Sequence, residues 1–211
     1  FITLQFVSSK VMEIIRTSIH GVVIIEPRVF SDARGYFFES FSDRDFNRQY
    51  AEALGNPAGY QPVTFVQDNE SRSAYGVIRG LHFQYPPYAQ SKLVRCIEGE
   101  VLDVAVDIRK GSPTYGQWAS CLLTGANHRQ FFIPKGFAHG FAVLSESATF
   151  LYKCDDFYHP EAEGGISIRD HRLGIDWQIP MENAVLSDKD MRHKTLEDLD
   201  SPFVFQTVNR R

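Results

Sequence analysis

Cysteine is scarce in this chain of 211 residues, and the few cysteines lie far apart. Cys96, Cys121 and Cys154 form no CxxC pair. An odd number of widely spaced cysteines argues against a disulfide framework and against a zinc ribbon. Each of the three lies in an apolar stretch, which favours buried, reduced thiols.

Long hydrophobic runs are also missing. No apolar run approaches the ~20 residues that a membrane-spanning helix needs, so we expect no membrane span. The opening segment 1–7 is apolar but short, and it lacks the basic start and small-residue cleavage site of a signal peptide. Met12 is a candidate native start, which would make residues 1–11 a non-native or disordered N-terminal extension. The default expectation is a cytoplasmic protein.

The chain has no run of basic residues, because Lys and Arg are interspersed among Asp and Glu. The formal net charge is -4. This pattern argues against nucleic-acid binding, although it leaves room for a local basic pocket that holds a small anion. There is no Pro/Ser-rich linker, internal repeat or low-complexity tract. All-β barrels of this length are commonly single units, so we expect one domain over residues 1–211.

Helical signals are few. Residues 43–54 place Phe46, Tyr50 and Leu54 four apart on one face, which predicts a short helix. A second helix is expected over residues 187–199, because Ser187 is a good N-cap and an acidic residue follows three positions later.

The rest of the pattern consists of short strands and turns. Strands are expected at 63–66, 77–83, 91–97, 101–108, 131–134, 140–144 and 149–153, with turns at 98–100, 111–113 and 124–127. Short strands at this spacing indicate a sandwich or barrel. The 17 phenylalanines and 9 tyrosines agree with a β-rich chain. The expected fold class is all-β, a jelly roll or double-stranded β-helix barrel with a few short peripheral helices.

Two histidines stand among β-forming residues, where a barrel interior would hold them: His82 and His139. A buried imidazole can serve as a proton base or as a metal ligand. Gln84 stands two positions after His82, so the HxH pair of a metal-binding barrel is broken. Two histidines alone make a poor transition-metal site, which disfavours a metal-dependent oxygenase and predicts that no metal takes part.

Acid–base chemistry fits these residues better. A histidine base needs a carboxylate that fixes its tautomer, and the sequence offers both Asp103 and Asp190 for His82. Tyr152 alternates with apolar neighbours and provides a phenol, and Lys92 lies mid-strand, where an inward-facing cation would stabilise an enolate. Taken singly, each also has a plainer interpretation as a core residue, a helix-start acid or a solvent-facing lysine.

A nucleotide site is suggested by two further segments. Residues 34–39 combine an arginine, aromatic rings and a glutamate, and residues 67–69 form a Gln-Asp-Asn triplet. Arginine suits phosphate, aromatic rings stack on bases, and amides bind base edges. A turn or a solvated strand edge is the plainer interpretation of each segment.

From about Met12 to Leu199 the sequence resembles the dTDP-4-dehydrorhamnose 3,5-epimerases, deoxysugar-nucleotide epimerases of the cupin superfamily. The resemblance rests on collinear motifs at 26–30, 32–40, 64–69, 79–84, 92–96, 103–109, 133–141, 151–153 and 186–190. The stretch 49–61 departs from the family by being longer than usual, which leaves the role of that loop open.

The resemblance implies a role for each site residue. The implied catalytic residues are the base His82 with its partner Asp190, the acid Tyr152, and Lys92, which lies beside the sugar ketone with the substrate-binding His139. The other implied substrate-binding residues are Phe30, Arg34, Glu39, Gln67, Asp68, Asn69, Arg79, Tyr158, Glu163 and Lys189.

The resemblance also implies the setting of the reaction. The substrate is a dTDP-sugar, no cofactor is needed, and the protein is a homodimer with exchanged N-terminal strands, in which Arg34 and Glu39 reach the partner's site. Three alternatives stay open: a 3- or 5-monoepimerase, an epimerase for another nucleotide sugar, and a non-catalytic cupin that only binds a sugar nucleotide. Tyr152 favours double epimerisation.

Overall fold

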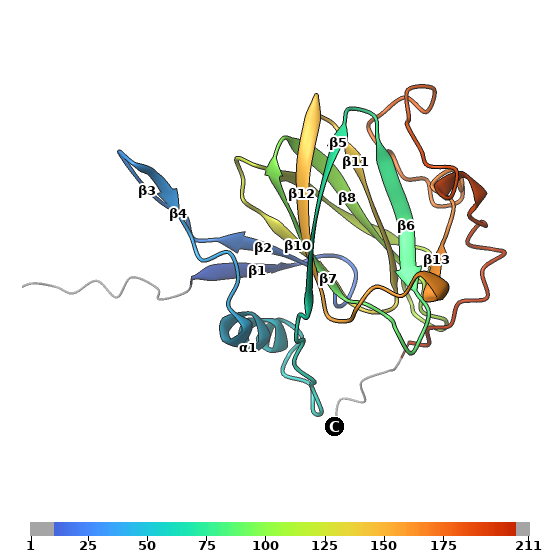
Figure 1. Cartoon of the computed structure of the whole chain (residues 1–211). Coiled ribbons are helices and arrows are strands. Elements are labelled where there is room, and N and C mark those ends of the chain that lie inside the picture. Colours follow the sequence, from blue (N-terminus) through green and yellow to red (C-terminus); the bar gives the residue numbers. More distant parts are fainter. Residues whose placement is uncertain (1–10, 206–211) are drawn as a thin grey trace, which may run out of the picture.

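Two antiparallel sheets face each other in the computed structural model, which describes residues 11–205 (Figure 1). Expectations about residues 1–10 lie outside the described part. The first sheet has the order β1 (Met12–Arg16), β2 (Val23–Pro27), β10 (Gln130–Ile133), β7 (Lys92–Glu98), β12 (Ser147–Cys154), β5 (Gln67–Ala74). The second has the order β13 (Glu163–Gly165), β6 (Ile78–Gln84), β11 (Phe137–Val143), β8 (Glu100–Asp107), β9 (Trp118–Thr124). This arrangement confirms the all-β jelly-roll barrel.

The main core lies between the two sheets and is formed by every second side chain of their strands, those that point inward. Phe131 packs inward with Phe150 and Phe141, whereas its neighbour Phe132 packs outward against the helix. The outer face of the second sheet is covered by the segment that follows β13, through residues such as Trp177. All residues from 101 to 107 are therefore buried. The three cysteines are buried and unpaired, as predicted.

Helix α1 (Asp43–Ala53) covers the outer face of the first sheet and confirms the predicted helix. Ser42 caps it by accepting a hydrogen bond from the Asp45 backbone N–H at 3.4 Å. Phe46 and Tyr50 are buried against Phe132, with ring centroids 5.1 and 4.7 Å away. No helix in residues 11–205 is long and apolar enough to span a membrane.

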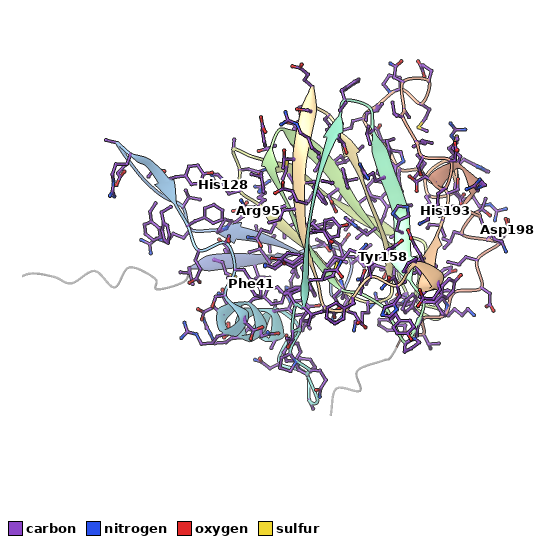
Figure 2. The ribbon with its side chains drawn as sticks, in the orientation of Figure 1. Phe41, Arg95, His128, Tyr158, His193 and Asp198 are labelled. Atoms are coloured by element: carbon purple, nitrogen blue, oxygen red, sulfur yellow. The ribbon has the colours of Figure 1, made fainter. Side chains whose placement is uncertain are left out.

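Beside this helix, β3 (Phe30–Asp32) and β4 (Gly35–Phe37) form a hairpin that projects from the barrel (Figure 1). Phe37, which pairs with Phe30 in this hairpin, is 71% exposed. At its base, Phe38 lies under the Arg95 guanidinium and 5.0 Å from the His128 ring, two side chains that Figure 2 shows on the hairpin side of the barrel. The aromatic side chains of the hairpin itself, Phe30, Tyr36 and Phe37, are thus exposed within one chain.

The predicted helix over 187–199 is wrong. Ser187 does accept a hydrogen bond from the Asp190 N–H at 3.1 Å, but only a 3₁₀ turn, Asp190–Arg192, follows. Beyond it the chain bonds to the segment after β13: the Lys194 carbonyl accepts from the Ser167 N–H at 2.7 Å. These contacts between distant segments outweigh the local capping signal.

The predicted strand at 63–66 is also wrong, because these residues form no strand, and only the Val66 N–H bonds to β12, at the Cys154 carbonyl, at 2.9 Å. The Val63 N–H donates to the Asn47 side chain of α1 at 2.7 Å, and β5 begins only at Gln67. The triplet 67–69 therefore starts a strand instead of following one. Strands β1, β2, β3, β4, β5, β9 and β13 were not predicted.

Candidate active site

Two adjoining cavities open between the sheets, with volumes of about 240 and 440 Å³. Both are lined by His82 from β6, Lys92 from β7 and Tyr152 from β12. The base candidate therefore comes from one sheet, and the lysine and phenol come from the other. The structure thus brings together the residues that the sequence suggested for acid–base chemistry.

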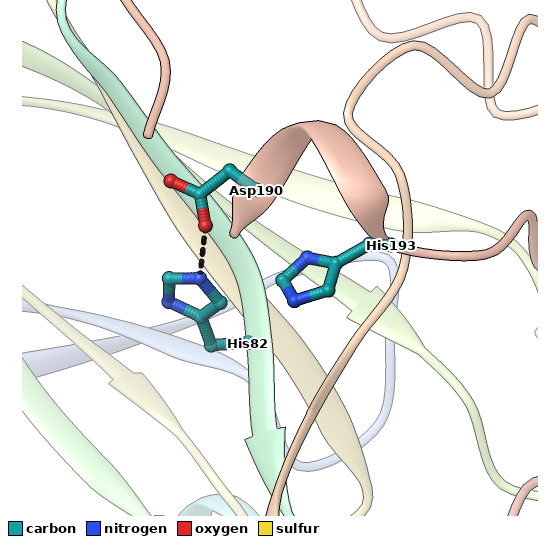
Figure 3. A group of neighbouring side chains, drawn as sticks. All are labelled: His82, Asp190 and His193. Carbon is teal, nitrogen blue, oxygen red and sulfur yellow. Dashed lines mark hydrogen bonds and ion pairs between the residues drawn. The ribbon is translucent and has the colours of Figure 1, made fainter. Parts of the chain in front are cut away.

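His82 is paired with Asp190, as Figure 3 shows. Its Nε2 lies 2.6 Å from Asp190 Oδ1. Burial works to raise the pKa of the Asp190 carboxyl, but the hydrogen bond and charge of His82 outweigh it, so the pKa is lowered. Because an ionised carboxylate only accepts, Nε2 carries the proton and Nδ1 is the free basic nitrogen.

Asp103, the other partner considered for His82, pairs with His139 instead. Its two carboxylate oxygens lie 2.9 and 3.0 Å from His139 Nε2, and its side chain is fully buried. Burial raises the pKa of Asp103, and His139 opposes that shift. His139 stands opposite His82 across the β11–β6 ladder, so the two imidazoles lie side by side on one face of the sheet.

Lys92 and Tyr152 face this pair from the first sheet. The Lys92 ammonium lies 5.9 Å from the centre of the Tyr152 ring. Burial lowers the pKa of Lys92, and burial followed by the nearby Cys154 thiol raises the pKa of Tyr152 above its usual 10. The phenol is therefore protonated at neutral pH and can donate a proton into the cavity.

The smaller cavity extends toward a polar group built around Glu163. Tyr158 donates a hydrogen bond to the Glu163 carboxylate at 2.5 Å, and Lys189 forms an ion pair with the same carboxylate. The bond to Glu163 raises the pKa of Tyr158 to about 12. Burial works to raise the pKa of Glu163, but its bonds to Lys189 and Tyr158 lower it.

The polar triplet divides between the two faces of β5. Gln67 and Asn69 line the smaller cavity, and the Gln67 side-chain oxygen accepts the Tyr158 N–H at 3.0 Å. Asp68 points to the other face, where both of its oxygens lie 3.0 Å from Lys153 Nζ. Within one chain, Asp68 is therefore not brought to the cavity.

Arg79 lines the larger cavity, where its Nε donates to the Ser73 hydroxyl at 3.2 Å. Three other predicted residues lie outside both cavities. Phe30 and Arg34 belong to the projecting hairpin, where Arg34 is paired with Asp32 at 2.6 Å. Glu39 lies against a small void beside α1. A single chain thus does not assemble these three with His82.

Gln84 has a role that the sequence did not reveal. Its side-chain amide donates to the carbonyls of Tyr88 and Phe157 at 2.6 and 3.1 Å, and its oxygen accepts the His159 N–H at 2.7 Å. These bonds hold the loop that carries Tyr158. The only sequence signal was negative: Gln84 stands where a metal-binding barrel would place a second histidine.

Other cavity residues carried no signal in the sequence. They include Ser71 and Gln90, which lie outside the family motifs and do not stand out by residue type. His193, whose ring lies beside His82 in Figure 3, was also missed. The three-residue spacing between Asp190 and His193 places the two side chains together only in a 3₁₀ turn, which the sequence did not predict.

A histidine–carboxylate pair that faces a phenol across a jelly-roll barrel is suited to moving protons to and from carbon, which is the chemistry of an epimerase. A family model described as dTDP-4-dehydrorhamnose 3,5-epimerase matches residues 16–198. The chain belongs to this family, an isomerase family, which confirms the assignment suggested by the sequence motifs.

Individual relatives agree with the family. A protein from Pseudomonas aeruginosa named dTDP-4-dehydrorhamnose 3,5-epimerase is 54% identical over 190 residues, 90% of this chain and 98% of the relative. A Legionella pneumophila epimerase, solved in complex with dTDP-4-keto-L-rhamnose, has a TM-score of 0.83 and 50% identity, covering 93% of this chain and 100% of that one. A Streptomyces bikiniensis 3'-monoepimerase, solved with dTDP-quinovose, has a TM-score of 0.76 and 33% identity, covering 86% of each chain.

Proposed function

We propose that this chain inverts C3 and C5 of dTDP-4-dehydro-6-deoxy-D-glucose, giving dTDP-4-dehydro-L-rhamnose on the route to dTDP-L-rhamnose. The observation that carries the proposal is the placement of His82 and Tyr152 on facing sheets of one cavity. An inverting enzyme must remove a proton from one face of the sugar and deliver one to the other. Two proton-transfer groups on opposite walls meet that requirement.

The first step removes a proton next to the ketone. C3 and C5 both flank the C4 carbonyl, so their protons are acidic enough for a positioned imidazole. His82 Nδ1 takes the proton, and Asp190 stabilises the imidazolium that forms. The electron pair moves to the carbonyl oxygen as an enolate. Lys92 and His139 line the same cavity and supply positive charge and a donor to that oxygen.

The second step returns a proton from the opposite side. Tyr152 donates its phenolic proton to the carbon, the enolate collapses to the ketone, and the configuration is inverted. Exchange with water then restores the phenol and the neutral imidazole. The reaction is an isomerisation with no net oxidation, so its chemistry requires neither a cofactor nor a metal.

The nucleotide is proposed to lie along the smaller cavity. Tyr158 would stack on thymine there, and Gln67 and Asn69 would bind polar groups of the nucleotide. Arg79 would contact the diphosphate from the adjoining larger cavity, and Lys189, beside Glu163, would contact the substrate from that cavity as well. The exposed Tyr158 ring and the charged pair at its edge support this placement. The Asp68 side chain does not reach the cavity within one chain. Its predicted contact with the substrate therefore requires a rearrangement of its ion pair with Lys153.

We also propose a cytoplasmic homodimer in which N-terminal strands are exchanged and Phe30, Arg34 and Glu39 complete the partner's site. The projecting hairpin supports this, because its aromatic residues are exposed in one chain. Mixing Arg34→Ala with His82→Ala chains should restore activity through heterodimers after subunit exchange. A fully active monomer in light scattering would contradict the dimer.

The test of the reaction is NMR of dTDP-4-keto-6-deoxyglucose with the protein in D₂O. Deuterium should enter at both C3 and C5, and the product should have the L-rhamno configuration; His82→Asn is the matched control. A 3-monoepimerase is the second candidate, since a 3'-monoepimerase shares 33% identity with this chain. Inversion at C3 alone would establish that candidate, and binding without exchange would indicate a non-catalytic cupin.

A further inference from the structure

His193 is a side chain beside His82 that the proposed mechanism does not use. The two rings meet at 85° with 5.4 Å between their centroids (Figure 3). His193 is half-buried, and its Nδ1 is buried without a hydrogen-bond partner among the described residues. Buried polar atoms are nearly always partnered, so this nitrogen calls for a functional explanation.

The position of His193 is built into the fold. Gly165 stands opposite His82 in the β13–β6 ladder, and a Cβ on Gly165 would lie 2.3 Å from His193 Cε1 and 2.5 Å from its Nδ1. The ring therefore occupies space that only a glycine leaves free. The Ser167 N–H bonds the Lys194 carbonyl at 2.7 Å and holds the chain directly after the ring.

We propose that His82, Asp190 and His193 form an inhibitory binding site for Zn²⁺. One ligand atom from each residue lies within 4.8 Å of the others, and this is the one such group within residues 11–205. Two imidazoles and one carboxylate form a donor set that zinc accepts in proteins, with the fourth position left to water. Mg²⁺ prefers oxygen ligands and would not compete.

Binding requires small movements of side chains. Zinc holds its N and O ligands at about 2.0–2.2 Å, which places tetrahedral donor atoms roughly 3.3 Å apart. The 2.6 Å contact between His82 and Asp190 must therefore open, and His193 must approach. Asp190 and His193 flank one short 3₁₀ turn, whose Met191 is 52% exposed, so the turn has room to adjust.

The protons balance as follows. Zinc takes the lone pair of His82 Nε2, and the proton that this nitrogen shared with Asp190 is replaced by one on Nδ1, through exchange with solvent. A neutral imidazole bound to metal through Nε2 carries its proton on Nδ1. The free basic nitrogen is thereby lost, and turnover stops. This inhibition rests on the proposed function, whereas the binding of zinc does not.

The test combines calorimetry with activity. Titration of the unliganded protein with ZnCl₂ should give one site per chain. His193→Ala and the size-preserving His193→Gln should each weaken binding by at least ~10-fold, since even indirect changes around a metal cost that much. The inhibitory zinc concentration should rise by the same factor, with each variant normalised to its own metal-free rate. EDTA should reverse inhibition of the wild type.

Two controls make the outcome decisive. His171→Gln removes an exposed histidine elsewhere and should bind zinc like the wild type, and MgCl₂ should give no heat from this site. Equal zinc binding by the wild type and both His193 variants would overturn the proposal. A chain that binds zinc through His193 but does not epimerise would instead contradict the proposed function and leave the metal site standing.

Discussion

The two histidine–carboxylate pairs of the cavity are built in different ways. His139 and Asp103 lie on neighbouring strands of one sheet, and the Asp103 side chain is fully buried. His82 lies on the next strand, but Asp190 arrives from a 3₁₀ turn 108 positions later, and His82 is 25% exposed. The pair fixed by the sheet suits a rigid donor, whereas the pair joined across segments leaves its base accessible to substrate.

The largest effect that separates the two pairs is expected at the base. His82→Asn should lower turnover by at least ~100-fold, the usual scale for a general base, because the change removes the imidazole nitrogen proposed to take the C3 or C5 proton. Asp190→Asn should give a loss of similar size, through the orientation of His82. Steady-state rates with a reductase-coupled assay measure both. Near-normal turnover in His82→Asn would remove it as the base.

Tyr152→Phe tests whether abstraction and return of the proton are separate. The change keeps the ring packed and deletes only the hydroxyl, so His82 should still exchange substrate hydrogens for deuterium in D₂O. Inversion should be impaired, with the C5 step affected most. Mass spectrometry for deuterium, alongside product formation, distinguishes the two steps. Wild-type inversion at both carbons would show that water or another residue is the acid.

A smaller contrast is expected in stability. The lowered pKa of Asp190 means that its ionised form stabilises the fold above pH 3.8, and this stabilisation is lost as pH falls through the folded-state value. The raised pKa of Asp103 has the opposite effect on stability. Its ionised form destabilises the fold, and that stability is recovered on acidification. Asp190→Asn should therefore lower Tm at pH 7, and Asp103→Asn should not.

For Asp190→Asn the loss should be about 1.5–3 kcal/mol, the value of a hydrogen bond to a charged group. This corresponds to a fall of roughly 3–12 °C in Tm for a chain of this size. Calorimetry on both variants and the wild type, from pH 7 downward, gives the comparison. The difference in Tm between the wild type and Asp190→Asn should close at acid pH. An equal loss of Tm in both variants at pH 7 would contradict the opposite effects assigned to ionised Asp190 and ionised Asp103.

The smallest expected effect is that of metal removal. Because neither pair needs a metal for proton transfer, EDTA should leave the turnover of metal-free protein unchanged. The check is a rate measured before and after chelation, followed by addition of single divalent ions. A loss on chelation that one ion restores would refute metal independence.

The contrast between the pairs also explains what could be predicted from sequence. The histidines, Lys92 and Tyr152 lie in apolar strands with clear alternation, so their inward positions follow from local patterns. Both carboxylates were noticed, but which one partners His82 depends on where the chain after β13 returns to the sheet. No local period encodes that return, and the helix predicted over 187–199 failed for the same reason.

Phe30 and Arg34 of the projecting hairpin, with Glu39 just after it, show a second limit. The sequence marked Phe30, Arg34 and Glu39 through their motif, yet nothing in one chain brings them to the cavity. In the proposed dimer their contact with substrate would come through a second copy, which neither strand periodicity nor the fold of a single chain specifies. Gln84 shows the reverse case, since its residue type gave no hint of the three bonds that it makes.

Those three bonds bear on how such barrels diversify. Replacing Gln84 with histidine would rebuild the HxH pair of a metal-binding barrel in a single step. The same step would leave the carbonyls of Tyr88 and Phe157 and the His159 N–H without their partner, and so release the loop that carries Tyr158. A lineage moving from proton transfer to metal chemistry would therefore have to redesign its nucleotide-side loop at the same time.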